Sequence, residues 1–103
     1  MIIPTSLEEI ADYIENKSTV LFFTADWCGD CVFIKPDMPD IVAAFPDFNF
    51  VEIDRDAYID LCQQWGGMGI PSFIATDNGK EIGRFVNKDR KTKEEIIEFL
   101  NTL

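Results

Sequence analysis

Apolar positions along the chain predict strands and helices that alternate. The run Val20-Leu21-Phe22-Phe23 forms the centre of one predicted strand. In all, four strands are expected, at 19–24, 48–54, 72–76 and 81–86. Helices are expected at 28–45 and 56–65, in the intervals between the first three strands. The pair Asn78-Gly79 stands between the last two strands, where it strongly favours a hairpin turn.

Helix start signals occur near both ends of the chain. Ser6-Leu7-Glu8-Glu9 has the form of a capping box, and so has Thr92-Lys93-Glu94-Glu95. Each is followed by apolar residues at helical spacing, namely Ile10, Tyr13 and Ile14 after the first, and Ile96, Phe99, Leu100 and Leu103 after the second. The sequence therefore predicts one helix before the first strand and one after the last.

This order of elements predicts an α/β fold in a single domain, residues 1–103. We expect a central mixed sheet of four to five strands with helices on both faces, and a right-handed first βαβ crossover. Functional sites in such sheets gather at the carboxyl ends of the strands. Cys28 lies just beyond one such end, after the strand at 19–24.

The net charge of −10 excludes some classes of partner. No basic patch is available to neutralise phosphates, so we expect neither nucleic acid nor a membrane surface as a partner. The segment Lys88-Asp89-Arg90-Lys91 is short and interrupted, and we interpret it as a solvated turn. No apolar stretch approaches the roughly 20 residues of a membrane span, and the start of the chain lacks a signal segment. We therefore expect a cytoplasmic protein.

Two cysteines carry the candidate chemistry, in the sequence Trp27-Cys28-Gly29-Asp30-Cys31. A thiol at the start of a helix loses its proton more readily, and the thiolate is the reactive form. The spacing lets Cys31 resolve a mixed disulfide formed at Cys28. Zinc binding is disfavoured, because the chain has no histidine and its third cysteine, Cys62, stands alone. We expect no metal, and no cofactor other than a redox-active Cys28–Cys31 disulfide.

Together, four local signatures resemble the thioredoxin family over nearly the whole chain. Trp27-Cys28-Gly29-x-Cys31 is similar to the family's active-site motif except at one position. Pro36 corresponds to the proline that kinks the active-site helix, and Asn78-Gly79 to the hairpin turn. Gly69-Ile70-Pro71 corresponds to the segment before the next strand, where the family's proline follows a cis peptide bond.

The resemblance implies a function and a role for each matching residue. Cys28 would be the exposed nucleophile and Cys31 the more buried, resolving cysteine of a protein disulfide reductase. The groove that binds the substrate would contain Trp27, Gly29, Gly69, Ile70 and Pro71. Electrons would pass from a reductase, such as an NADPH-dependent thioredoxin reductase, to disulfide-containing client proteins. We expect the protein to act as a monomer.

Several positions depart from the family pattern. Asp30 replaces a proline, and its negative charge should disfavour a thiolate at Cys28, so we take it as a tuning residue. Phe22 stands where the family has a buried aspartate, and Phe50 replaces the lysine that pairs with that aspartate, so exchange near neutral pH should be slow. Two further differences, at Met68 and Asn87, would alter the groove.

Cys62 shares a helix face with apolar residues and is expected to be a buried thiol rather than a redox switch. Two alternative functions remain open. One is a glutaredoxin-like or more oxidising thiol exchanger, which the absence of basic residues near the site disfavours. The other is a partner-binding module whose groove is switched by redox state.

Overall fold

The computed structural model describes residues 1–103 and confirms the alternation of strands and helices. The elements are α1 (Leu7–Asn16), β1 (Ser18–Thr24), α2 (Gly29–Ile34), the 3₁₀ turn η1 (Lys35–Asp37), α3 (Met38–Ala44), β2 (Asn49–Asp54), α4 (Ile59–Trp65), β3 (Ser72–Asp77), β4 (Lys80–Phe85) and α5 (Lys93–Asn101). The helix expected at 28–45 is divided into α2 and α3, because Pro36 in η1 has no N–H for a helical hydrogen bond.

The four strands form one mixed sheet in the order β2-β1-β3-β4, which confirms the predicted α/β fold class. β1 pairs in parallel with β2, whereas β3 runs antiparallel to both β1 and β4. The hairpin between β3 and β4 turns at Asn78 and Gly79, whose φ angles are 49° and 88°. Both angles are positive, as a type I′ turn requires, so the Asn-Gly signal is confirmed.

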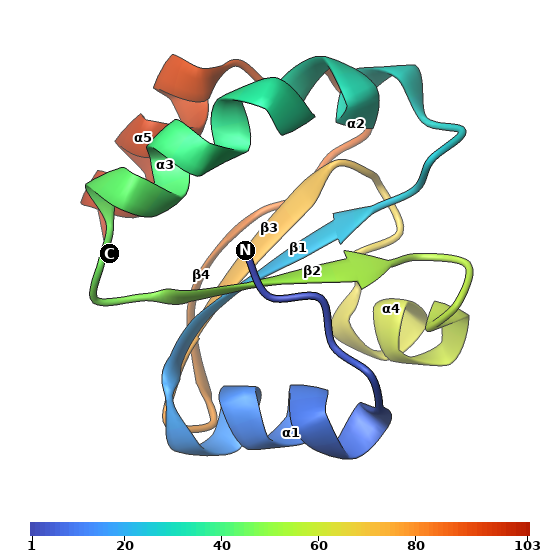
Figure 1. Ribbon diagram of the computed structural model, residues 1–103, viewed down its shortest axis with the longest axis vertical. Coiled ribbons are helices and arrows are strands. Elements are labelled where there is room, and N and C mark those ends of the chain that lie inside the picture. The colour runs from blue at the N-terminus through green and yellow to red at the C-terminus, as the bar shows by residue number, and fades with distance from the viewer.

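Helices cover both faces of the sheet (Figure 1), with α1 and α4 on one side and α2, α3 and α5 on the other. Side chains of β1 alternate between the two cores: Leu21 and Phe23 pack with α1 and α4, whereas Val20 and Phe22 pack with α3 and α5. The Phe22 ring stacks on Phe73 of β3 at a centroid distance of 5.0 Å. Because both faces are covered, β1 is buried along almost its whole length.

The predicted helix starts differ in detail. At α5 the capping box is complete, with Thr92 and Glu95 bonded to each other's backbone N–H groups. At α1 the Ser6 hydroxyl accepts from the N–H of Glu9, but the Glu9 carboxylate accepts from Thr5 instead of completing a box. α1 has 10 residues, and no helix is long and apolar enough to cross a membrane.

Candidate functional site

Cys28 lies at the carboxyl end of β1, where the chain leaves the sheet and enters α2. It is the residue that caps this helix, and its Sγ accepts a hydrogen bond from the N–H of Cys31 at 3.2 Å. Cys28 and Cys31 are free thiols that lie 2.6 Å apart. Cys28 is only 8% exposed and Cys31 is fully buried, so Cys28 is less exposed than expected, although it is still the more accessible of the two.

Burial sets the acidity of Cys31. Removal from water and, to a lesser extent, the hydrogen bond with Cys28 together raise its pKa to about 11, against smaller opposing effects of Thr24 and Ala25. No carboxylate stands at the position of Phe22, whose ring packs in the core on the other face of the sheet. The thiol of Cys31 is therefore protonated at neutral pH and has no buried acid beneath it to exchange its proton.

A shallow groove of about 380 Å³ opens beside Cys28. It is lined by Trp27, Cys28, Gly29, Asp30, Arg55, Met68, Gly69, Ile70 and Lys88. The indole of Trp27 is 63% exposed, and its Nε1 donates to Asp56 at 2.6 Å. Of the predicted groove residues, only Pro71 does not line the groove; it is buried after the cis Ile70–Pro71 bond that the resemblance implied.

Asp30 projects from the first turn of α2 toward the loop between β4 and α5. Its Oδ1 accepts from Nε of Arg90 at 2.9 Å, and the Arg90 guanidinium lies 4.2 Å from the centre of the Phe33 ring. The carboxylate between the two thiols thus has a paired positive charge from a distant part of the sequence. This pairing offsets the negative charge that the sequence places beside Cys28.

The loop that follows β4 is exposed at Lys88, Asp89 and Arg90, as a solvated turn would be, but Lys91 contradicts that prediction. Lys91 is only 1% exposed, and its ammonium donates to the carbonyl oxygens of Asn87 and Asp89 and to the Asn87 side chain, at 2.9 to 3.0 Å. Burial lowers the pKa of Lys91, and nearby negative groups oppose that effect. Lys88 of the same loop lines the groove. The expectation failed at Lys91 because charge alone does not reveal that three oxygens can satisfy one buried ammonium.

Arg55 is the other groove residue that sequence reasoning missed. Its Nη1 donates to the carbonyl oxygen of Met68 at 3.3 Å, and its guanidinium lies 5.3 Å from the centre of the Trp27 ring. A signal was available, because Arg55 directly follows β2, whose carboxyl end lies at the same edge of the sheet as that of the parallel strand β1. The argument that basic residues are absent near the site is therefore wrong.

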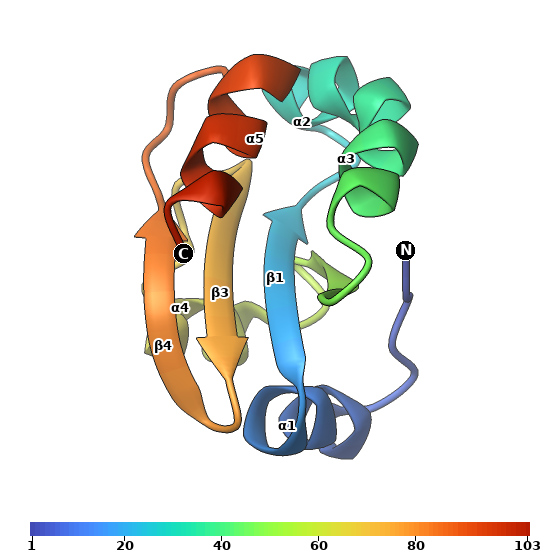
Figure 2. The ribbon, with the colours of Figure 1, turned by 90° about the vertical axis from the view of Figure 1, so that its left-hand side faces the viewer.

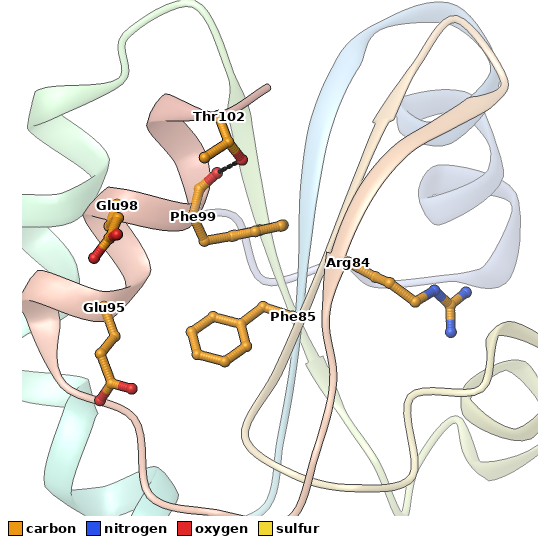
Figure 3. A pocket seen from close by; sticks show the side chains of 6 residues that line it. All are labelled: Arg84, Phe85, Glu95, Glu98, Phe99 and Thr102. Carbon is orange, nitrogen blue, oxygen red and sulfur yellow. Dashed lines mark hydrogen bonds between the residues drawn. The ribbon is translucent and has the colours of Figure 1, made fainter.

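Two other features lie outside this site. Cys62 is fully buried, as predicted, and burial raises the pKa of its thiol. A hollow of about 350 Å³ lies between β4 and α5 (Figure 3), where Glu95 and Glu98 of α5 lie to one side of Phe85 and Phe99 while Arg84 points away. Arg84 pairs instead with Glu81. Neither feature includes a reactive group next to Cys28.

Comparison with known proteins agrees with this geometry. The family model described as Thioredoxin matches residues 2–102. Thioredoxin H2-1 of Oryza sativa is 32% identical over 98 residues, which cover 93% of this chain and 69% of the relative. Thioredoxin H-type 1 of Nicotiana tabacum is 33% identical, with 88% and 76% covered. The chain thus spans roughly two thirds to three quarters of the length of these relatives.

Solved structures show the same likeness. The crystal structure of thioredoxin from Trypanosoma brucei brucei superposes with a TM-score of 0.86 at 25% identity, covering 99% of this chain and 88% of the other. Thioredoxin NaTrxh from Nicotiana alata gives a TM-score of 0.81 at 29% identity, with 98% and 90% covered. The sequence and structural similarities both extend over nearly the entire chain.

Proposed function

The chain belongs to the thioredoxin family, and on that premise we propose that Cys28 and Cys31 are the dithiol with which it reduces disulfides in client proteins. The family relationship supports thiol–disulfide exchange as the activity. The observation that carries the assignment of residues is the position of Cys28, which caps α2 within the groove and lies 2.6 Å from Cys31. No other pair of cysteines in the chain lies within one motif.

In the first step the Cys28 thiolate attacks one sulfur of the client disulfide. A bond forms between Cys28 Sγ and that sulfur, the client disulfide breaks, and the other client sulfur leaves as a thiolate that takes up a proton. The hydrogen bond from the N–H of Cys31 favours negative charge on Cys28 Sγ. The groove residues Trp27 and Ile70 border the position where the client segment must lie.

In the second step Cys31 loses its proton and attacks Cys28 Sγ. The mixed disulfide breaks, the Cys28–Cys31 disulfide forms, and the client leaves with both of its sulfurs reduced, so two electrons have moved from the protein to the client. The high pKa of Cys31 makes its deprotonation the costly part of this step at neutral pH. We propose that water or the departing client thiolate accepts the proton, because Phe22 cannot.

A reductase must then return the protein to the dithiol, and an NADPH-dependent thioredoxin reductase has the required chemistry. We propose that the chain itself holds no cofactor beyond its disulfide, and that it acts as a cytoplasmic monomer. Glutathione-linked exchange is the second candidate, and the positive charges of Arg55 and Lys88 in the groove favour it more than the sequence did.

The test is trapping of the mixed disulfide. In Cys31→Ser the first step proceeds and the second cannot, so incubation with an oxidised client peptide should give a covalent adduct at Cys28, seen by mass spectrometry under non-reducing conditions. Cys62→Ser should form no adduct that persists, because its Cys31 still releases the client. An adduct with the double variant Cys28→Ser/Cys31→Ser would contradict the assignment. A partner retained noncovalently by that double variant would instead support a binding module.

A further inference from the structure

We propose that the groove beside Cys28 selects client segments that carry acidic residues next to the disulfide, with Arg55 and Lys88 as the residues that recognise them. The inference rests on the proposed function and adds a substrate class to it. It comes from the distribution of positive charge in a strongly acidic protein. Two cations without ion-pair partners line one short groove.

Most of the nine basic side chains already have acidic partners. Five form ion pairs within 4.0 Å, namely Lys17, Lys35, Arg84, Arg90 and Lys93. The remaining four are Arg55, Lys80, Lys88 and Lys91. Lys91 is buried beneath the loop after β4, and Lys80 lies at the hairpin. The other two line the groove, so positive charge that is available to a ligand is concentrated there.

The guanidinium of Arg55 is held on one edge and has no partner on the other. Nη1 donates to the carbonyl oxygen of Met68, whereas Nε is buried and makes no hydrogen bond. The buried Nε is out of reach of a ligand, so a client carboxylate would bind at the terminal nitrogens Nη1 and Nη2, which carry further N–H groups. A carboxylate can accept two parallel N–H bonds from one guanidinium. Its charge would pair with a cation that has no acidic partner in the folded protein.

Lys88 stands on a groove wall that is held in place. The wall is formed by the loop after β4. Lys91 fixes this loop through three hydrogen bonds to oxygens of the loop, and Arg90 links the loop to α2 through its ion pair with Asp30. Asn87 packs closely on Gly69, where an added Cβ would lie 3.0 Å from the Asn87 carbonyl carbon. The loop backbone thus places Lys88 beside the segment that contains Gly69 and Ile70, and Lys88 and Arg55 both line the groove with Cys28.

Three acidic groups near the groove have contacts within the protein, two of them with a cation. Asp30 is paired with Arg90, Asp56 accepts from the Trp27 indole, and Asp26 lies 3.8 Å from Lys35. Local contacts therefore favour an acidic client, whereas the total charge of −10 favours a basic one. The two arguments predict opposite charges for the preferred client, so a comparison of acidic and basic peptides distinguishes between them. Trp27, Met68 and Ile70 provide apolar area for a protein segment, and this favours a protein client over a small anionic disulfide.

The experiment measures single-turnover rate constants of the pre-reduced protein with three short peptides. The peptides share one intramolecular disulfide and differ only in the residues that flank it, which are Glu, Gln or Lys. We expect the Glu peptide to react about two- to fivefold faster than the Gln peptide, and the Lys peptide to be slowest. Arg55→Gln and Lys88→Gln should each remove much of the rate advantage of the Glu peptide over the Gln peptide.

The matched control is Lys80→Gln, which makes the same change in net charge at the hairpin and should leave the order of the peptides unchanged. Arg55→Lys retains the charge without the two-donor edge and should recover part of the preference of the wild type. Equal rates for the three peptides, or a preference for Lys, would overturn the inference and leave the proposed function standing. Absence of Cys28-dependent turnover with all three would contradict the function itself. Faster reaction of glutathione disulfide than of the Glu peptide would overturn the choice of a protein client.

Discussion

The two ends of the sheet differ in the burial and the hydrogen bonding of their charged and polar groups. At the hairpin end, short side chains and backbone groups bond across α1, β1 and β3, as in Ser18 to Asp77 at 2.7 Å and Gly79 to Ile14 at 2.8 Å. Lys80 remains exposed there. At the cysteine end, which is the upper end in Figure 2, Lys91 is buried and Arg55 keeps a buried donor without a partner.

This difference indicates that the cysteine end of the sheet contains the groups whose burial is unfavourable for stability. Charged groups in a low-dielectric environment are unfavourable unless neighbouring groups compensate. Here Lys91 is compensated by oxygens of its own loop, whereas Asp30 depends on Arg90 and Arg55 on Met68. At the hairpin end the same fold needs only local turn chemistry and small polar contacts. The cysteine end should therefore be more sensitive to substitution of its charged residues than the hairpin end.

The largest expected difference concerns Lys91 and Lys80. Replacement Lys91→Ala leaves a cavity and removes three hydrogen bonds, so the free energy of unfolding should fall by about 3 kcal/mol. Lys80→Ala at the exposed hairpin should change it by no more than about 0.5 kcal/mol. Urea unfolding of both variants, followed by tryptophan fluorescence and circular dichroism, gives the two values.

Lys91→Met keeps most of the side-chain volume and so separates the hydrogen bonds from the cavity. It should lie between wild type and Lys91→Ala in stability. Equal stability of Lys91→Ala and Lys80→Ala would show that the buried ammonium contributes nothing to the cysteine end.

A second difference is the response of the cysteine end to alkali. In the folded protein the pKa of Cys31 is raised to about 11 from a reference value of 9.0, so the folded state holds the proton more tightly than the unfolded state. The resulting contribution to stability is complete below about pH 9 and is lost as the pH rises to about 11, a loss of roughly 2–3 kcal/mol. Unfolding of the reduced protein at a series of pH values measures this loss.

The variant Cys31→Ala isolates the contribution of this thiol, because other groups titrate in the same range. Its stability should fall less than that of the wild type between pH 9 and 11. The ¹³Cβ shift of labelled Cys31 provides an independent reading of its titration. A midpoint near 9 would contradict the effect of burial.

The smallest difference concerns two ion pairs. Asp30 and Arg90 approach to 2.9 Å and the Asp30 side chain is 35% exposed, whereas Asp12 and Lys17 at the hairpin end are 3.9 Å apart and the Asp12 side chain is 56% exposed. A double-mutant cycle with Asp30→Asn and Arg90→Gln should give a coupling energy of about 0.5–1 kcal/mol, and the corresponding cycle for Asp12 and Lys17 should give nearly zero. A coupling that disappears at low salt, or one larger for Asp12, would contradict the role of Arg90 as the partner of Asp30.

Sequence patterns predicted the elements well because their signals are local. The apolar run at Val20–Phe23, the turn at Asn78-Gly79 and the cap at Thr92 each act through residues that are near neighbours in the chain. The boundaries of the strands were correct to within one residue. The one divided helix also had a local cause in Pro36.

The candidate site was only partly predictable from the sequence. The spacing of Cys28 and Cys31 identifies them in the sequence. The partner of Asp30, in contrast, lies 60 residues away and belongs to no recognisable motif. The burial of Lys91 depends on carbonyl oxygens that face inward, and backbone direction in a loop is not encoded in a charge pattern. Residues that meet only in the folded protein were therefore the ones that reasoning from the sequence missed.

The strand order has a consequence for biosynthesis. β1 emerges early from the ribosome, yet Ile70 and the antiparallel neighbour β3 that follows it come roughly fifty residues later, and the loop with Lys88 comes later still. Contacts so distant in sequence form late, when most of the chain has been translated. The nascent protein thus displays Cys28 and Cys31 well before it has a groove. The groove that borders its two thiols is complete only when the last third of the chain has been added.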